Sequence, residues 1–336
     1  MGLPTRPLGT SGVEITRTGF GAWAIGGDWA FGWGPQDDSA SVRAIVHAVE
    51  RGVNWIDTAG VYGYGHSEQV VGQALRAMPA GDRPLVFTKC GRVGDASRPW
   101  EPPVTNLHPD SMRREIEASL RNLGVEAIDL YQIHWPNDTT GTPLEESWGV
   151  MARFVEEGKA RAIGVSNFEL EELERCERIR HVDSLQPPFS AIHREAAPLL
   201  EWARRHGTGA IVYSPMQSGL LTDRFSMERV ASMATTDHRR GKPDFQTPQL
   251  ERNLALRDAM RVIARRHGVD TGAVAVAWAL AWPGVTGAIV GARSPEQVDG
   301  WVPAATLELT RDELAEIADA IERTGAGSGQ VAPVPS

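Results

Sequence analysis

The stretch Leu85-Val-Phe-Thr-Lys-Cys90 and the later stretch Ala127-Ile-Asp-Leu-Tyr-Gln-Ile-His134 are short runs in which apolar residues dominate instead of alternating with polar ones. Strands of a parallel sheet that is buried on both faces have this pattern. Eight runs of this kind occur along the chain, at residues 18–23, 54–59, 85–90, 127–134, 161–166, 184–186, 210–214 and 288–291. The sequence therefore predicts a set of buried parallel strands.

The segments between these runs show the 3.6-residue apolar period of amphipathic helices, for example at residues 39–51, 110–123 and 250–267. Three helix starts carry capping signals, at Pro109-Asp110, Ser294-Pro295-Glu296 and Thr310-x-x-Glu313. Regular alternation of strands and helices favours an α/β protein with a (β/α)8 TIM barrel. The 336 residues exceed the roughly 250 that one barrel needs, so a single domain over residues 1–336 is expected.

Three segments lie outside the simple repeat. Residues 6–16, with turn residues Gly9-Thr-Ser-Gly12, predict an N-terminal β-hairpin that plugs the bottom of the barrel. Residues 221–248 form a long polar loop after the seventh strand, and loops of this length are usually functional or mobile. The segment from Gly325 to Ser336 is rich in glycine and proline, which predicts a disordered tail.

Composition excludes several classes of protein. The net charge of -9 disfavours binding to nucleic acid, which normally requires a basic patch. No apolar run approaches the ~20 residues of a membrane span, and Met1 to Thr10 lacks the charged and apolar regions of a signal peptide, so a cytoplasmic protein without a membrane partner is expected. Cys90 and Cys176 have no metal-ligand spacing, so both are interpreted as buried small hydrophobes and no metal is expected.

Polar residues follow three consecutive predicted strands, where the active site of a barrel forms. Asp57 ends the second run and Tyr62 follows it, Lys89 lies at the end of the third, and His134 ends the fourth. Each residue alone is better explained by structure, but their joint occurrence favours a catalytic set. Reduction of a carbonyl needs an acid, and an ammonium beside a tyrosine can lower the pKa of the phenol. Tyr62 is therefore predicted as proton donor, Lys89 and Asp57 as the groups that tune it, and His134 as the donor that polarises the carbonyl.

These residues occur in segments that resemble the aldo-keto reductase superfamily from about Leu8 to Leu309. The matching segments are Gly19-Phe-Gly-Ala-Trp23, Asn54-Trp-Ile-Asp57-Thr-Ala-Gly-Val-Tyr62, Lys89, Asp129-Leu-Tyr-Gln-Ile-His134-Trp-Pro, Ile163-Gly-Val-Ser166-Asn167-Phe168, Gln186-Pro-Pro-Phe-Ser190, Tyr213-Ser214-Pro215 and Gly291-Ala-Arg293. The Leu-Gln-Pro-Pro and Gly-Ala-Arg-x-Pro-Glu-Gln segments are most similar to bacterial inositol-cluster and general-stress reductases. The resemblance implies an NADP(H)-dependent enzyme of a small carbonyl or alcohol substrate, without metal, as a monomer or weak homo-oligomer.

The resemblance also implies a set of cofactor contacts. Ser166, Asn167 and Gln186 would bond the nicotinamide carboxamide, Tyr213 would stack on the ring, and Asp57 would lie beside them. The other implied contacts are Gly21, Ala22 and Trp23 near the ribose, Ser214, Pro215, Gly219, Leu221 and Arg224 along the pyrophosphate, and Gly291, Arg293 and Gln297 at the adenine end. Ser166-Asn167 could also serve as a helix N-cap. The family often has Glu-Asn after Pro-Glu-Gln, which is absent here, so Trp301 either stacks on adenine or packs in the core.

Arg293 directly precedes the predicted helix start at Ser294 and is predicted to select NADPH by binding its 2'-phosphate. The alternative is a surface ion pair with Glu296 or Asp299. Aromatic residues in or beside the top loops suggest an apolar or sugar-stacking substrate pocket, at Trp23, Trp29, Phe31, Trp33, Trp100 and Trp135.

Two other functions are compatible with parts of the sequence. Gly19-x-Gly21-x-x-Ala24 matches a short dinucleotide fingerprint of doubly wound dehydrogenases, but no apolar helix opens after it and no Tyr-x-x-x-Lys pair exists. A cofactor-sensing regulatory subunit of the same barrel fold, with slow catalysis, is the second alternative, and a turnover assay distinguishes it from an enzyme.

Overall fold

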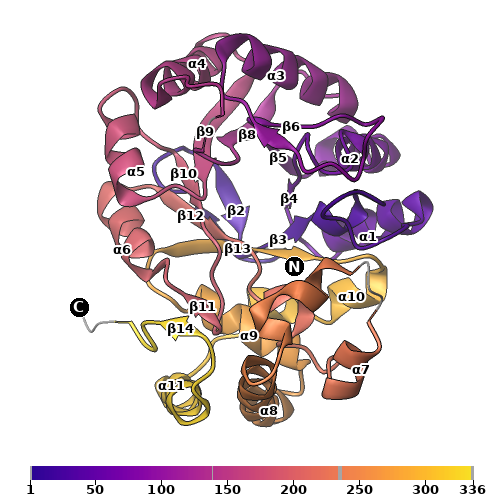
Figure 1. Ribbon diagram of the computed structural model, residues 1–336, viewed down its shortest axis with the longest axis vertical. Coiled ribbons are helices and arrows are strands. Elements are labelled where there is room, and N and C mark those ends of the chain that lie inside the picture. The colour runs from indigo at the N-terminus through magenta and orange to yellow at the C-terminus, as the bar shows by residue number, and fades with distance from the viewer. Residues whose placement is uncertain (1, 138, 234–236, 334–336) are drawn as a thin grey trace.

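The computed structural model describes residues 2–137, 139–233 and 237–333, and its centre is a closed barrel of parallel strands (Figure 1). The strands follow each other around the ring in sequence order: β3 (Thr18–Gly21), β4 (Trp55–Asp57), β5 (Leu85–Cys90), β8 (Ile128–Ile133), β9 (Ala160–Ser166), β10 (Ser184–Gln186), β12 (Gly209–Val212) and β13 (Val285–Gly291). Parallel pairing of β13 with β3 closes the ring. The predicted TIM barrel is confirmed, and each barrel strand overlaps one of the predicted runs.

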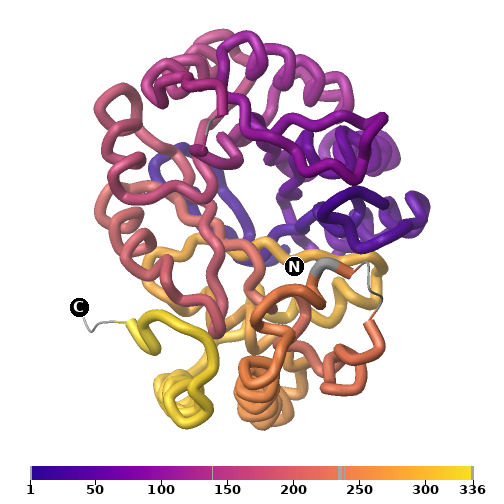
Figure 2. The backbone as a smooth tube through the Cα atoms, in the orientation of Figure 1, coloured from indigo at the N-terminus to yellow at the C-terminus, as the bar shows by residue number. Residues whose placement is uncertain are grey.

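The N-terminal hairpin closes the bottom of the barrel, as predicted. Its strands β1 (Thr5–Pro7) and β2 (Glu14–Thr16) pair antiparallel, and Figure 2 shows this indigo segment across the ring of strands. Leu8 and Ile15 are fully buried against side chains inside the barrel, among them Trp55, Phe87, Leu130, Ile211 and Ile289. The indole N–H of Trp55 donates to the carbonyl of Thr16 at 2.8 Å, so polar as well as apolar contacts hold the plug.

A ring of helices covers the outside of the barrel (Figure 1). It consists of α1 (Asp38–Glu50), α2 (His66–Ala77), α3 (Pro109–Leu123), α4 (Leu144–Glu156), α5 (Leu170–Glu177), α6 (Ala197–His206), α9 (Thr271–Leu280) and the short α10 (Pro295–Asp299). Every residue of α9 is buried, because α8 (Gln249–His267) packs over it, and α11 (Arg311–Thr324) lies beside α8. The expected caps are present: Thr310 and Glu313 form a capping box, and Ser294 precedes Pro295 at the start of α10.

The long loop after β12 contains short helical turns instead of remaining irregular. These are η3 (Gln217–Gly219), α7 (Met227–Ala231), η4 (His238–Gly241) and η5 (Pro243–Phe245), while residues 234–236 lie outside the described chain. The guanidinium of Arg257 on α8 donates to the carbonyls of Thr222 at 3.2 Å and Phe225 at 2.6 Å. This buried arginine ties the loop to the outer helices, so its path over the barrel mouth is fixed by tertiary contacts.

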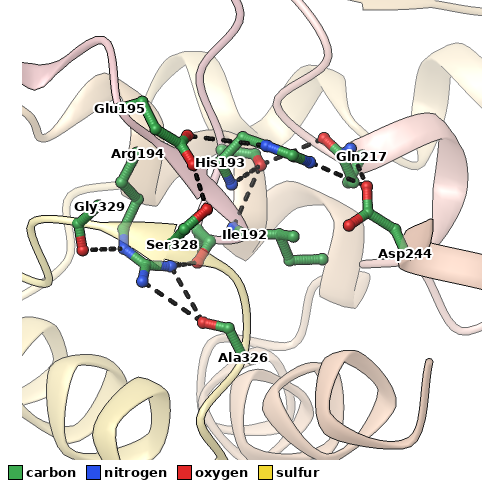
Figure 3. A network of polar contacts seen from close by, with 11 residues as sticks. Ile192, His193, Arg194, Glu195, Gln217, Asp244, Ala326, Ser328 and Gly329 are labelled. Carbon is green, nitrogen blue, oxygen red and sulfur yellow. Dashed lines mark hydrogen bonds and ion pairs between the residues drawn. The ribbon is translucent and has the colours of Figure 1, made fainter. Parts of the chain in front are cut away.

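The expectation of a disordered tail from Gly325 is wrong for the described residues up to 333. Ser328–Gly329 (β14) pairs in parallel with His193–Arg194 (β11), and Ala326 is buried (Figure 3). The guanidinium of Arg194 is buried and needs acceptors, which the tail provides through the carbonyls of Ala326 at 3.3 Å and Gly329 at 3.4 Å. Composition could not predict these contacts, because the partner residues lie over a hundred positions earlier in the chain.

The same polar network continues from the tail to the loop after β12 (Figure 3). The ring of His193 lies 3.6 Å from Glu195, which accepts a hydrogen bond from Ser328. On its other side His193 bonds Asp244 of η5 at 2.9 Å, and Asp244 also accepts from the side chain of Gln217 at 2.8 Å. Gln217 belongs to η3 at the barrel mouth, so the tail is connected to the edge of the candidate site.

Two general expectations concern membranes and cysteines. None of the helices in the described part of the chain has the length and apolar character required to cross a membrane. Cys90 and Cys176 are both buried, and neither forms a disulfide, as the sequence predicted. Burial raises the pKa of the Cys176 thiol to about 12, which keeps it protonated.

Candidate active site

A cavity of about 1180 Å³ opens at the carboxyl ends of the barrel strands. Its walls come from loops after most of the strands, so the fold gathers residues that are distant in sequence. The predicted residues that line it are Gly21, Trp23, Asp57, Tyr62, His134, Ser166, Asn167, Gln186, Tyr213, Ser214, Pro215, Gly219, Arg224, Gly291, Arg293 and Gln297. The site therefore contains nearly all of the residues that the sequence proposed for it.

A buried ion pair lies beneath this cavity. Lys89 Nζ is 2.5 Å from Asp57 Oδ1, and the two side chains are 0% and 4% exposed. Lys89 also donates to the carbonyl of Thr58 at 2.8 Å, and Gln186 donates to the second oxygen of Asp57 at 2.9 Å. Burial raises the pKa of Asp57 and lowers the pKa of Lys89, and the direct contact between the two charges opposes both shifts. The adjacent positions of β4 and β5 in the barrel make this pair possible.

Tyr62 lies above the ion pair in the turn that follows β4. Its backbone N–H donates to Ala59 at 3.0 Å, and its ring is 5.3 Å from Lys89 Nζ, measured to the ring centre. The ring also meets His134 edge-to-face, with ring centres 5.6 Å apart. Lys89 and His134 thus both lie against the ring of Tyr62, and Asp57 is bound to Lys89.

The expected lowering of the Tyr62 pKa is wrong for this structure. Burial raises the pKa of Tyr62 well above its ordinary value, and the negative charge of Asp57 adds to this effect. The physical reason is the contact between Lys89 and Asp57, which leaves little net positive charge to stabilise a phenolate. The phenol of Tyr62 is therefore protonated at neutral pH.

His134 is buried as a neutral imidazole. Burial lowers the pKa of His134 well below its ordinary value, and the charges of Lys89 and Arg92 lower it further. Its Nδ1 has no hydrogen-bond partner among the residues that the structure describes. The carbonyl of His134 accepts from Asn167 at 3.0 Å, so its backbone position is fixed.

The strand ends after β9, β10 and β12 are joined by a polar network on the cavity wall. Ser166 donates to the carbonyl of Gln186 at 2.8 Å, and Asn167 donates to Ser166 at 3.0 Å. The hydroxyl of Tyr213 donates to Asn167 Oδ1 at 2.7 Å. Asn167 and Ser214 adopt left-handed backbone with φ of 62° and 58°, and such conformations concentrate at functional sites. Ser166–Asn167 does not cap α5, because Glu169 is the N-cap of that helix.

Comparison with known proteins agrees with the fold. The sequence profile described as "Aldo/keto reductase family" matches residues 17–322. The chain belongs to the aldo/keto reductase family. The NADH-specific methylglyoxal reductase of Escherichia coli (strain K12) is 33% identical over 333 residues, which cover 94% of this chain and 99% of that protein.

Solved structures give the same result for this aldo/keto reductase. The glycerol dehydrogenase AKR11B4 from Gluconobacter oxydans is 36% identical, covers 98% of both chains and superposes with a TM-score of 0.86. An aldo-keto reductase from Klebsiella pneumoniae in complex with NADPH is 26% identical, covers 100% of both chains and has a TM-score of 0.72. These similarities extend over the whole barrel, so the doubly wound dehydrogenase is excluded.

Arg293 of the reductase lines the cavity, and its protein partners differ from the surface ion pair that was the alternative prediction. Its guanidinium donates to the side chain of Gln36 and to the carbonyls of Trp33 at 3.3 Å and Pro35 at 2.6 Å. Neither Glu296 nor Asp299 forms the ion pair that was considered as the alternative. Arg293 thus fixes the loop between β3 and α1, while its backbone N–H donates to Gln297 at 2.8 Å.

A few predicted residues lie elsewhere. Ala22 and Leu221 are fully buried, and their side chains do not line the cavity. Trp100 is 61% exposed and lies outside the lining, whereas the other five aromatic residues proposed for the pocket contribute to it. Trp301 is 2% exposed and packs in the core at the edge of the cavity, so burial accounts for it.

Several cationic residues at the cavity were not identified from the sequence. Arg239 lies over the ring of Trp33 at 4.7 Å and over that of Phe225 at 5.4 Å, and Lys242 follows it in the same loop. The run His238-Arg239-Arg240-Gly-Lys242 is a charge cluster that could have drawn attention to this loop. Arg229 and Arg92 also line the cavity and were missed, and Arg92 lies two residues after the end of the third predicted run.

Proposed function

We propose that this aldo/keto reductase reduces an aldehyde or ketone to the alcohol, and catalyses the reverse oxidation, with NADPH as hydride donor and Tyr62 as proton donor. One observation carries the proposal: the buried Lys89–Asp57 pair lies beneath Tyr62, whose ring contacts His134 at the mouth of the cavity. A buried ion pair next to a protonated phenol and a neutral imidazole is suited to proton transfer at a carbonyl oxygen.

The residues of the cavity fit a dinucleotide cofactor. Small-molecule pockets usually measure ~300–1,000 Å³, so a cavity of about 1180 Å³ has room for a dinucleotide together with a small substrate. Amide and hydroxyl groups of Ser166, Asn167 and Gln186 lie on the wall that contains Asp57, where they would hold a nicotinamide carboxamide. Left-handed backbone at Ser214 and Ser218 brings the chain along the same cavity, where its peptide groups would hold phosphates.

When bound, the reduced nicotinamide supplies a hydride to the carbonyl carbon. Tyr62 donates its hydroxyl proton to the carbonyl oxygen as negative charge develops there, and burial keeps that proton in place by raising the pKa of Tyr62. His134 donates an imidazole N–H to the same oxygen and orients the substrate. Lys89 Nζ lies 5.3 Å from the centre of the Tyr62 ring, so it would offset part of the charge of the phenolate that remains, while Asp57 positions Lys89 and weakens this effect.

We propose NADPH in preference to NADH on the basis of residues of this chain. The E. coli relative is NADH-specific, whereas the Klebsiella structure contains NADPH, so similarity alone does not decide the choice. Burial is the larger cause of the lowered pKa of Arg293, and the positive charge of nearby Arg239 is the second cause. Arg239 is paired with Asp237 at 2.7 Å, whereas the hydrogen bonds of the Arg293 guanidinium go to neutral acceptors, so a 2'-phosphate would supply a counter-charge for Arg293.

The test is a turnover assay on the purified chain. NADPH and NADH oxidation is followed by absorbance with a panel of aldehydes and ketones, and the reverse reaction with the alcohols. The proposal expects turnover with at least one carbonyl and its loss in Tyr62→Phe. Cofactor binding without turnover of any compound would instead favour a cofactor-sensing subunit of the same fold.

A further inference from the structure

Arg92 lies on the cavity wall beside the proposed catalytic residues. It follows the end of β5 and begins β6 (Arg92–Val93), which pairs antiparallel with β7 (Val104–Thr105). Its guanidinium donates to Thr105 Oγ1 at 3.1 Å, and both residues line the cavity with His134. The hairpin therefore holds the guanidinium at the substrate end of the cavity, in the region of Tyr62 and His134.

Among the residues that the structure describes, no carboxylate neutralises the positive charge of Arg92. No carboxylate within the described ranges lies within 4.0 Å of its guanidinium, which donates a hydrogen bond to the neutral hydroxyl of Thr105. Arg98, in the loop between the same two short strands, instead pairs with Asp95 at 3.1 Å and with Glu101 at 2.8 Å. Burial of a guanidinium without a counter-charge is unfavourable. Burial accordingly lowers the pKa of Arg92.

The neighbouring charges do not compensate for Arg92. Lys89 is neutralised by Asp57. The charge of Arg92 lowers the pKa of the His134 imidazole, although burial and Lys89 are the larger causes of that shift. An unpaired, partly desolvated cation beside a reacting centre is costly for the free protein, so it indicates an anionic ligand.

We propose that the preferred substrate carries an anionic group, a carboxylate or a phosphate, which binds Arg92 while its carbonyl group meets Tyr62 and His134. This inference rests on the proposed carbonyl reduction and specifies its substrate class. The planar guanidinium offers parallel donors to carboxylate or phosphate oxygens, which gives orientation as well as affinity. Trp29 and Trp135 on the same cavity provide apolar walls for the short stem between the anionic group and the carbonyl.

The first test compares matched substrates that differ in charge. 4-Oxobutanoate is paired with its methyl ester, and glyceraldehyde 3-phosphate with glyceraldehyde, so that one arm tests a carboxylate and the other a phosphate. We expect a kcat/KM about 10- to 100-fold higher for the charged member of at least one pair, the range of a hydrogen-bonded charge contact. Equal kcat/KM within both pairs would overturn the proposal.

The second test removes the guanidinium. Arg92→Met should abolish the preference for the charged member while leaving the neutral member within about threefold, and Arg92→Lys should restore part of it. Arg98→Met is the matched control, because it removes an arginine of the same loop that already has two carboxylate partners. An equal loss for charged and neutral substrates in Arg92→Met would show that Arg92 only supports the hairpin, and would refute the inference.

A binding assay separates failure of this inference from failure of the proposed reaction. Succinate and its dimethyl ester cannot be reduced under these conditions, and their binding is followed by quenching of the tryptophans at the cavity. Tighter binding of succinate that Arg92→Met abolishes would support an anion site even if no carbonyl were turned over. Turnover of neutral carbonyls, with no effect of Arg92→Met on succinate binding, would contradict the anion site and leave the reductase activity intact.

Discussion

Replacement of Lys89 by methionine should destabilise the barrel strongly, because Asp57 would remain buried without its counter-charge. Both side chains are almost completely enclosed, and the 2.5 Å contact is the only ion pair of Asp57 in the described chain. The bond from Gln186 would remain, but a neutral amide cannot replace an ammonium. Removal of one partner of a buried pair typically costs about 3–5 kcal/mol in the free energy of unfolding.

The pH dependence gives this prediction a sign. In Lys89→Met the pKa of Asp57 should rise further, because burial already raises it and the opposing ammonium is gone. A carboxyl whose folded pKa lies above its unfolded value contributes stability at low pH and loses it as the pH rises through the folded pKa. The deficit of the variant should therefore be small under acid conditions and grow toward neutral and alkaline pH.

The assay is urea unfolding of wild type, Lys89→Met, Asp57→Asn and the double variant at several pH values. The double variant has no charge at positions 57 and 89. It should therefore recover at least half of the free energy of unfolding lost in Lys89→Met, and its stability should lack the pH dependence due to Asp57. Lys159→Met is a control for the loss of a lysine, because Lys159 pairs with Glu117 and Glu157 near the surface, where such pairs contribute about 0–1 kcal/mol. Equal stability of Lys89→Met and the double variant within about 0.5 kcal/mol would refute the reasoning.

Three other substitutions test the site and its surroundings. Tyr62→Phe should reduce kcat by several orders of magnitude and leave the Kd of NADPH within about threefold, because it removes a proton and no proposed cofactor contact; near-normal turnover would reject Tyr62 as the acid. Arg293→Ala should weaken NADPH binding about five- to 150-fold by fluorescence titration with NADH nearly unaffected, and an equal effect on both would contradict a phosphate contact. The hydrogen bond to Asp244 raises the pKa of His193, so the stability that this contact contributes is complete below about pH 6.5 and is lost as the pH rises through the raised value. His193→Gln should abolish that pH dependence in thermal unfolding, and an unchanged profile would exclude His193 as its source.

The catalytic set was predictable because a barrel converts order in the sequence into order in space. Asp57, Lys89 and His134 lie at the ends of consecutive strands, and parallel neighbours bring their carboxyl ends to one rim. The same regularity explains why the polar residues after β9 and β10 were found. Arg92 was missed because it lies two positions beyond a strand end, in a short hairpin that shows no periodicity of its own.

The sequence by itself determined the strands, their order, the capping of the helices and which polar side chains lie at the barrel mouth, because these features depend on local patterns. Only the tertiary structure decided how the charges are compensated. Burial raises the pKa of Tyr62, and Lys89, paired with Asp57, does not reverse that shift; Arg293 bonds the loop at Trp33 instead of a neighbouring carboxylate. The tail is ordered because its Ala326 carbonyl accepts a hydrogen bond from the buried guanidinium of Arg194. Burial and charge pairing depend on residues that approach through the fold from distant positions, and no local pattern contains that information.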